Sequence, residues 1–205
     1  MIIPRYEYRC FGLDLLPLAS VLKNEASQDG KVFTAEVYLL TRKAHRLSAK
    51  MREDHFEIKE LMNVEDGLEK WTVRMKEAFP LSRTQVEDEI LPQLGIQASI
   101  RQEEYDQEEL TERLTGLDPG LLVIHVAKRR DRYVWGSVKA EFSHLLVNGA
   151  LTYTCCLESE DKEALLEALR KMGLDTKENQ SYPAFLKGLT GILPLKKIPV
   201  FPEDY

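Results

Sequence analysis

The sequence predicts an α+β domain built around an antiparallel β-barrel, with helices flanking the barrel. Three observations lead to this fold class. Most segments alternate apolar and polar residues with a period of two, which is typical of strands with one buried face. Turn-forming residues separate several of these strands closely enough for hairpins. Only a few segments have helical periodicity, so the strands are expected to close, or nearly close, into one sheet. The 205 residues are expected to form one domain.

The first half of the chain is predicted to be mostly strand, with one helix. The helix covers residues 13–26, where Pro17 is expected in the first turn because proline interrupts later turns. β-branched and aromatic residues, or charged residues alternating with apolar ones, mark the strands. The turn-like sequence REDH joins two of them. The expected strands are residues 5–11, residues 31–42, the two strands within 46–61, and residues 67–79.

Residues from about 80 to 120 are predicted to be a helical insertion between two strand-rich halves. The segment from Ser82 to Leu94 has a helical pattern. Residues 101–114, RQEEYDQEELTERL, are dense in Glu and Gln and have few apolar anchors. This composition suits a solvated helix or a mobile surface segment, whose charges serve solubility.

The second half begins with three predicted antiparallel strands after Leu121. The dipeptide Asn148-Gly149 marks the clearest hairpin turn, because both residues tolerate the positive φ values that such turns need. Residues 161–174 form an amphipathic helix in this prediction, with Asp161 as its N-cap and Gly173 at its end. A shorter helix is expected over residues 181–191.

Composition excludes several classes of function. The chain has 34 acidic and 28 basic residues, a net charge of -6, which argues against nucleic-acid binding by a broad basic surface. No run approaches the roughly 18 apolar residues of a membrane span, and the N-terminus lacks a signal-peptide pattern. Three cysteines, Cys10, Cys155 and Cys156, have no zinc or disulfide spacing. A cytoplasmic protein is expected, and a homodimer is compatible with the sequence.

The charged positions of the predicted strands are mostly basic, although the chain as a whole is acidic. One interpretation is an ordinary sheet with a charged face in water. The other is a concave sheet whose charged face lines a cavity, where lysines and arginines repel one another until a multiply charged anion binds. The positions concerned are Arg5, Glu7, Arg9, Lys50, Arg52, Glu57, Lys59, Lys128 and Arg130.

Several motifs, in this order along the chain, resemble those of the CYTH or triphosphate tunnel metalloenzyme superfamily. The opening strand has Arg5-x-Glu7-x-Arg9 where the family has E-x-E-x-K. The second strand has an acidic-x-Tyr pattern, and a later strand resembles V-x-K-x-R-x-x-Y. The matching segments are Glu36-Val-Tyr38, Lys50-Met-Arg52, Glu57-Ile-Lys59, Val126 to Tyr133, and the final strand, helix and S-Y-x-x-L segment from Leu157 to Leu189.

The resemblance implies an eight-stranded antiparallel tunnel that binds an inorganic, nucleoside or organic triphosphate, with Mg or Mn assisting hydrolysis. Glu7 and Lys50 are the catalytic candidates. The metal candidates are Glu7, Glu141 and Glu158. The candidates for binding the phosphate-rich anion are Arg5, Arg9, Lys50, Arg52, Lys59, Arg74, Lys128 and Arg130.

The sequence also departs from the family pattern in its acids. Arg5 replaces the first glutamate of the opening motif, and the paired acids of the last strand fall at Thr154 and Cys156. Because Mg prefers oxygen ligands, these losses thin the expected metal site. Three functions therefore remain open: a metal-dependent triphosphatase or related phosphohydrolase, a non-catalytic protein that binds polyphosphate, nucleotide or another anion, and a structural or partner-binding sheet protein.

Overall fold

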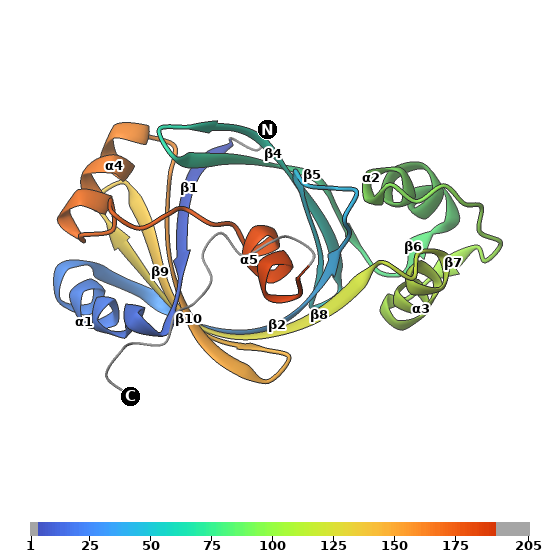
Figure 1. The fold of residues 1–205 in the computed structure, drawn as a ribbon, viewed down its shortest axis with the longest axis horizontal. Helices are drawn as coiled ribbons and strands as arrows, with labels where there is room; N and C mark the ends of the chain where they lie inside the picture. Colours follow the sequence, from blue (N-terminus) through green and yellow to red (C-terminus); the bar gives the residue numbers. More distant parts are fainter. Residues whose placement is uncertain (1–3, 192–205) are drawn as a thin grey trace.

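The segments with period-two alternation form a closed eight-stranded antiparallel barrel (Figure 1), which confirms the predicted fold class. The computed structural model describes residues 4–191. Around the barrel the strand order is β1, β10, β9, β8, β2, β3, β4 and β5, and β5 pairs with β1 to close it. The strands are β1 (Arg5–Phe11), β2 (Ser27–Leu40), β3 (Leu47–Arg52), β4 (His55–Glu65), β5 (Leu68–Ala78), β8 (Leu122–Trp135), β9 (Val138–Val147) and β10 (Ala150–Ser159).

Tight turns set the register of the hairpins. Asn148 and Gly149 join β9 to β10 with φ values of 47° and 90°, and two positive φ values fit the twist of the flanking strands. Glu53 has φ 55° in the turn between β3 and β4. Both turns were predicted from the sequence, and both place a charged residue of one strand beside a charged residue of the next.

Helices on one outer side of the barrel cover β8, β9 and β10. They are the 3-10 helix η1 (Leu13–Leu15), α1 (Leu16–Glu25) and α4 (Lys162–Lys171). Asp161 caps α4 by accepting hydrogen bonds from the backbone of its first turn, as predicted. Leu22 and Leu165 are fully buried against outward-facing apolar residues of the strands. None of the helices in residues 4–191 combines the length and apolar composition needed to cross a membrane.

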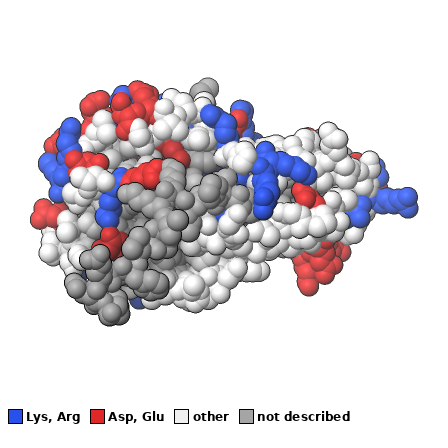
Figure 2. Space-filling model, viewed as in Figure 1, with Lys and Arg blue, Asp and Glu red and all other residues white. Residues whose placement is uncertain are grey.

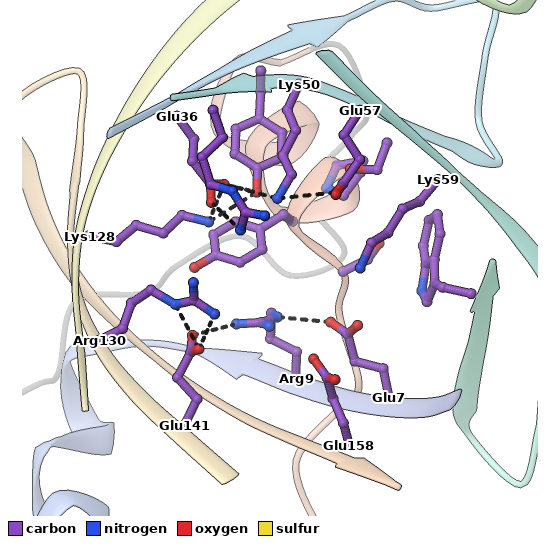
Figure 3. A pocket seen from close by; sticks show the side chains of 17 residues that line it. Glu7, Arg9, Glu36, Lys50, Glu57, Lys59, Lys128, Arg130, Glu141 and Glu158 are labelled. Carbon is purple, nitrogen blue, oxygen red and sulfur yellow. Dashed lines mark hydrogen bonds and ion pairs between the residues drawn. The ribbon is translucent and has the colours of Figure 1, made fainter. Parts of the chain in front are cut away.

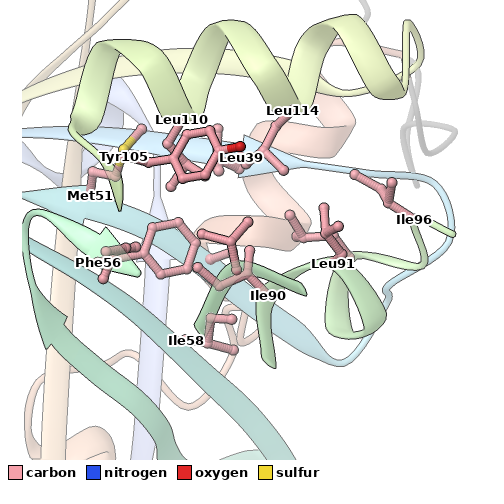
Figure 4. Close-up of a cluster of buried hydrophobic side chains, with 14 of the residues drawn as sticks. Leu39, Met51, Phe56, Ile58, Ile90, Leu91, Ile96, Tyr105, Leu110 and Leu114 are labelled. Atoms are coloured by element: carbon pink, nitrogen blue, oxygen red, sulfur yellow. The ribbon is translucent and has the colours of Figure 1, made fainter. Parts of the chain in front are cut away.

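The segment between β5 and β8 packs on the opposite outer side, against β3, β4 and β5 (Figures 1 and 4). It contains β6 (Leu81–Ser82), the π-helical η2 (Gln85–Ile90), α2 (Leu91–Leu94), β7 (Glu104–Tyr105) and α3 (Gln107–Leu117). Leu110 and Leu114 of α3 are fully buried beside Met51, Phe56 and Ile58 of the barrel wall. Thus α3 is a packed amphipathic helix. Its apolar residues are few but fall on one face.

Helix α5 (Tyr182–Leu189) lies inside the barrel, a position that the sequence did not indicate (Figure 1). Its buried Tyr182 and Leu186 pack with apolar residues at one end of the barrel interior, among them Tyr38, Ile124 and Leu145. The short helix therefore closes that end with a small apolar core. The charged part of the interior lies next to the start of α5.

A candidate anion-binding cavity

The inward-facing side chains of the barrel surround a cavity of about 130 Å³ beside the start of α5 (Figure 3). Directly paired residues on adjacent antiparallel strands point to the same side of the sheet. The register pairs Glu7 with Glu158 and Lys50 with Glu57, so the charged face of the strands is the inner face. The lining residues are Glu7, Arg9, Glu36, Tyr38, Ser48, Lys50, Arg52, Glu57, Lys59, Trp71, Lys128, Arg130, Glu141, Glu158, Ser181, Tyr182 and Pro183.

Acidic side chains almost balance the basic ones in this cavity. Six basic and five acidic residues line it, so their formal charges sum to +1. The sequence predicted a cationic interior whose lysines and arginines repel one another. Instead, carboxylates stand between most of the cations and hold them in place, which removes most of that repulsion.

Glu36 of β2 is the centre of one ion-pair network (Figure 3). Its Oε2 lies 2.6 Å from Lys128 Nζ and 3.4 Å from Lys50 Nζ, and it accepts a hydrogen bond of 2.9 Å from the Tyr38 hydroxyl. Arg52 Nη1 lies 3.7 Å from the other oxygen. Burial alone would raise the pKa of Glu36, but the Lys128 and Lys50 ammonium groups outweigh it and hold that pKa well below its usual range.

Lys128 of β8 is the most enclosed of the cavity cations, with 4% of its side chain exposed. Its ammonium group lies 3.7 Å from the centre of the Tyr182 ring and donates to Tyr38 Oη at 3.1 Å. Burial lowers the pKa of Lys128 to about 7, although the Glu36 carboxylate opposes this shift. Lys128 is therefore a cation whose charge responds to pH near neutrality.

Two arginines form a second network with Glu7 and Glu141 (Figure 3). Arg130 Nε donates to Glu141 Oε2 at 2.7 Å, and Ser143 donates to the other oxygen at 2.8 Å. Arg9 Nε donates to Glu7 at 3.1 Å, and its Nη1 lies 3.9 Å from Glu141. Burial would raise the pKa of Glu141, but both arginines outweigh it and lower that pKa. Both acids therefore keep their charge.

Three groups in the cavity are open to a ligand. Arg9 Nη1 and the Tyr182 hydroxyl are buried and have no hydrogen-bond partner. Lys59 makes no ion pair with any residue in the part of the chain that the structure describes, although it lines the cavity. Buried donors without partners are rare in folded proteins, because each costs free energy. Together these groups offer N–H and O–H donors to the oxygens of an anion.

The cavity contains most, but not all, of the basic residues predicted to bind an anion. Lys50 and Arg52 come from β3, Lys59 from β4, and the remaining three, Arg9, Lys128 and Arg130, from β1 and β8. Arg5 does not line the cavity. Its half-exposed guanidinium lies 3.7 Å from Glu158 and 3.8 Å from Glu160.

Arg74 lies outside the cavity, which corrects its predicted place among the anion-binding residues. The pairing of β4 with β5 shifts by one residue, because Ile58 pairs with Met75 but Lys59 pairs with Val73. Arg74 is the extra residue of this irregularity, and its exposed guanidinium forms an ion pair with an acidic side chain of β4. An extra residue of this kind breaks strict alternation, so the side-chain direction cannot be counted through it.

The predicted metal ligands are only partly brought together. Oxygens of Glu7 and Glu158 lie within 4.8 Å of each other and of Cys156 Sγ, whereas Glu141 is not in this group. Burial raises the pKa of the Cys156 thiol well above its usual value, so the sulfur stays protonated, and Arg9 already donates to Glu7. Burial and the Glu7 carboxylate also raise the pKa of Glu158. Mg and Mn are usually held by one or two carboxylates together with phosphate oxygens. Here Glu7 is already paired with a guanidinium and the third group is a neutral thiol, so the donor set as it stands does not fit them.

Sequence reasoning left four important lining residues out of the predicted site. Glu36 and Tyr38 were noticed only as a motif, although an acid within an otherwise apolar strand is a signal of a buried charged partner. The strand irregularity at β5 hid Trp71, which shares the inner face with Arg5. Tyr182 reaches the cavity because α5 lies inside the barrel, and no local pattern signals that placement.

Comparisons with known proteins find similarity in structure only. No family model matches the chain, and no curated protein matches its sequence. The PH1012 protein from Pyrococcus horikoshii has a TM-score of 0.52 and 16% identity, covering 86% of this chain and 94% of its own. A conserved hypothetical protein from Pyrococcus furiosus has a TM-score of 0.51 and 14% identity, covering 88% and 97%. A putative adenylyl cyclase from Hippeastrum, described as having a dominant triphosphatase activity, has a TM-score of 0.47 and 14% identity. The match covers 94% of this chain and 99% of that protein. At such identities the first two matches show a shared fold.

Proposed function

The chain has a CYTH-like tunnel fold, and we propose on that basis that it binds a short phosphate-rich anion, such as a triphosphate, inside the barrel. The observation that carries this proposal is the convergence of six basic side chains from four strands on one small cavity. Phosphate oxygens accept several charge-assisted hydrogen bonds at once, and lysines and arginines on different walls can surround such a group.

The near-neutral charge of the cavity supports a compact, highly charged ligand. A singly charged anion gains little where five carboxylates already neutralise most of the cations. A triphosphate places several negative charges within a short length, so it can compete with Glu36 and Glu57 for Lys50, which lies between them. Inorganic, nucleoside and organic triphosphates share this chemistry.

The geometry favours binding over metal-assisted hydrolysis. Hydrolysis of a phosphate chain by this kind of site relies on metal ions that neutralise charge in the transition state. The donor set around Glu7 does not fit Mg or Mn, since Arg9 already pairs with Glu7 and the neighbouring Cys156 offers a neutral thiol. Lys50 is then a binding residue, Glu7 positions Arg9 through their ion pair, and we expect no release of phosphate.

Calorimetric titration with tripolyphosphate tests the binding. We expect Lys128→Ala and Arg130→Ala each to weaken the affinity by about 10- to 100-fold, because each removes charge-assisted hydrogen bonds to the anion. The affinity of the unaltered protein should fall as salt rises. Lys171→Ala is the matched control, since Lys171 is exposed on α4 and pairs with Glu167. Unchanged affinity in both cavity variants would remove the ligand role of these residues.

Phosphate release from tripolyphosphate and nucleoside triphosphates, with and without Mg or Mn, tests for turnover. We expect tight binding without release. Metal-dependent release that disappears in both Lys50→Ala and Glu7→Gln would instead establish a phosphohydrolase. These two variants separate hydrolysis in this cavity from a contaminating activity, because both residues line it.

A further inference from the structure

Arg9 occupies the most acidic part of the cavity (Figure 3). On β1 it lies directly opposite Cys156 of β10, two residues from Glu7. Its guanidinium donates to Glu7 at 3.1 Å and lies 3.9 Å from Glu141 on the next wall. A fixed positive charge therefore already stands between the carboxylates of two strands that are not neighbours.

Several contacts hold the guanidinium in this place. Only 7% of the Arg9 side chain is exposed, and its Cζ lies 4.5 Å from the centre of the Tyr182 ring. The Arg9 backbone N–H donates to Asn179 Oδ1 at 2.8 Å, and the Arg9 carbonyl accepts from Gln180 at 2.7 Å. The segment that leads into α5 thus fixes the backbone of Arg9, and the Tyr182 ring at the start of α5 packs against the Arg9 guanidinium.

A divalent cation would have to compete with this guanidinium for the same carboxylates. Glu7 is engaged by Arg9, and Glu141 is engaged by Arg130 and Ser143. A cation beside Glu7 would also lie close to a guanidinium that cannot lose its proton. At the same time Arg9 Nη1 is buried without a hydrogen-bond partner, so this cation has a donor left for a ligand oxygen.

We infer that Arg9 supplies the fixed positive charge at the acidic wall of the cavity, and that this chain binds its phosphate-rich anion without a metal. The inference rests on the proposed anion binding. Arg9 Nη1 donates to a phosphate oxygen at the acidic wall, while Lys50, Lys59 and Lys128 hold the rest of the anion. The ligand is then the metal-free anion, which carries more charge than its Mg complex.

Titration of the unaltered protein with tripolyphosphate in excess EDTA, and again in excess Mg, tests the inference directly. We expect full affinity in EDTA and weaker affinity in Mg, because Mg neutralises part of the anion before it binds. Binding that occurs only with Mg or Mn overturns the metal-free mode but leaves the proposed anion binding intact. No binding under either condition refutes the proposed function, and with it this inference.

Arg9→Gln provides the second test, with circular dichroism to verify its fold. In EDTA we expect the variant to bind tripolyphosphate about 10- to 100-fold more weakly, because a charged donor is lost. Adding Mn should restore part of the affinity in this variant only, since Glu7 and Glu158 are no longer opposed by a guanidinium. Arg83→Gln is the control, as Arg83 is half-exposed, lies outside the cavity and pairs with Glu103. Wild-type affinity of Arg9→Gln in EDTA would overturn the role of Arg9.

Discussion

At the scale of single residues, the carboxylates of the cavity decide how its cations behave. Glu36 has 1% of its side chain exposed and contacts two lysines, an arginine and a tyrosine. A buried charge is tolerated only when it is paired, so Lys128 depends on this acid when no ligand is bound, whereas Lys50 also pairs with Glu57. A bound anion can take over the same task, which links the stability of the protein to its ligand.

Glu36→Gln should lower the free energy of unfolding by about 3–5 kcal/mol at neutral pH, because it leaves buried cations without their partner. Since the pKa of Glu36 is lowered in the folded protein, its contribution is present above the ordinary carboxyl pKa and is lost as pH falls below it. The difference between variant and wild type should therefore shrink in acid. Denaturant unfolding at neutral and acidic pH measures both effects. An equal difference at both pH values would contradict the assignment.

The affinity for the anion should fall as pH rises above neutrality. Burial lowers the pKa of Lys128 to about 7, so Lys128 is charged below that pH and mostly neutral above it in the free protein. An anion favours the charged form, and binding above pH 7 should therefore take up a proton. Titrations in buffers of different ionisation enthalpy measure the uptake. Lys128→Arg, which keeps its charge, should flatten the pH profile.

Tyr182→Phe should separate binding from stability. The hydroxyl is buried without a partner, so its removal should leave the melting temperature unchanged or raise it. If the hydroxyl donates to the anion, the affinity should fall by about 2- to 10-fold. Tyr6→Phe is the control, because the Tyr6 hydroxyl donates to Glu65 outside the cavity. A variant that melts earlier and binds normally would show that the hydroxyl has a structural role.

At the scale of elements, α5 is the only described helix that lies inside the barrel (Figure 1), and it carries both an apolar and a cavity-lining surface. Leu186 is fully buried, so Leu186→Ala should cost about 2–5 kcal/mol of unfolding free energy. Leu189, on the same helix, is 55% exposed, and Leu189→Ala should have little effect. Thermal unfolding of the two variants compares them. Equal effects would mean that α5 does not pack as described.

Individual strands were largely predictable because their alternation is local, whereas irregularities were not. The charged face of β1, β3 and β8 could be read residue by residue, since each of these strands keeps a period of two where the cations lie. In β5 the extra residue Arg74 ends this regularity, so Arg74 turns outward and Trp71 inward. The position of α5 depends on packing between distant segments, which no window of sequence contains.

At the scale of the whole molecule, apolar cores outside the barrel are separate from the charged cavity inside it. One outer core joins α3 and η2 to β3, β4 and β5, and another joins α1 and α4 to β8, β9 and β10. Charge on the surface is mixed as well. In Figure 2 acidic and basic side chains both lie near α4, and the segment between β5 and β8 also carries both kinds.

Stability and anion binding should therefore be separable. Leu110→Ala removes a fully buried side chain of α3 and should cost about 2–5 kcal/mol of unfolding free energy. Its affinity for tripolyphosphate should equal that of the wild type, because Leu110 lies in the outer core and does not line the cavity. Denaturant unfolding and calorimetry measure the two quantities. Reduced affinity of a fully folded Leu110→Ala variant would show that the outer core and the cavity are coupled.

The barrel itself was predictable from the number and order of alternating strands, and its charged interior from the excess of basic residues on one face. The balance of charge was not, because Glu36 and Glu141 become partners of Lys128 and Arg130 only after the sheet closes. Local pattern indicates which face a residue takes. Pairing across the barrel depends on register between strands that are far apart in sequence.

The apolar packing of α5 also closes one end of the barrel. Within residues 4–191, Tyr182 and Leu186 fill one end of the interior, so a long polymer cannot be threaded from one opening to the other. A ligand must therefore enter and leave through the same opening. If the ligand is part of a longer polymer, the protein binds its terminal groups and leaves the remainder in solvent. Such a cavity binds one chain terminus per protein molecule, so the amount of bound protein would depend on the number of chain termini and not on chain length.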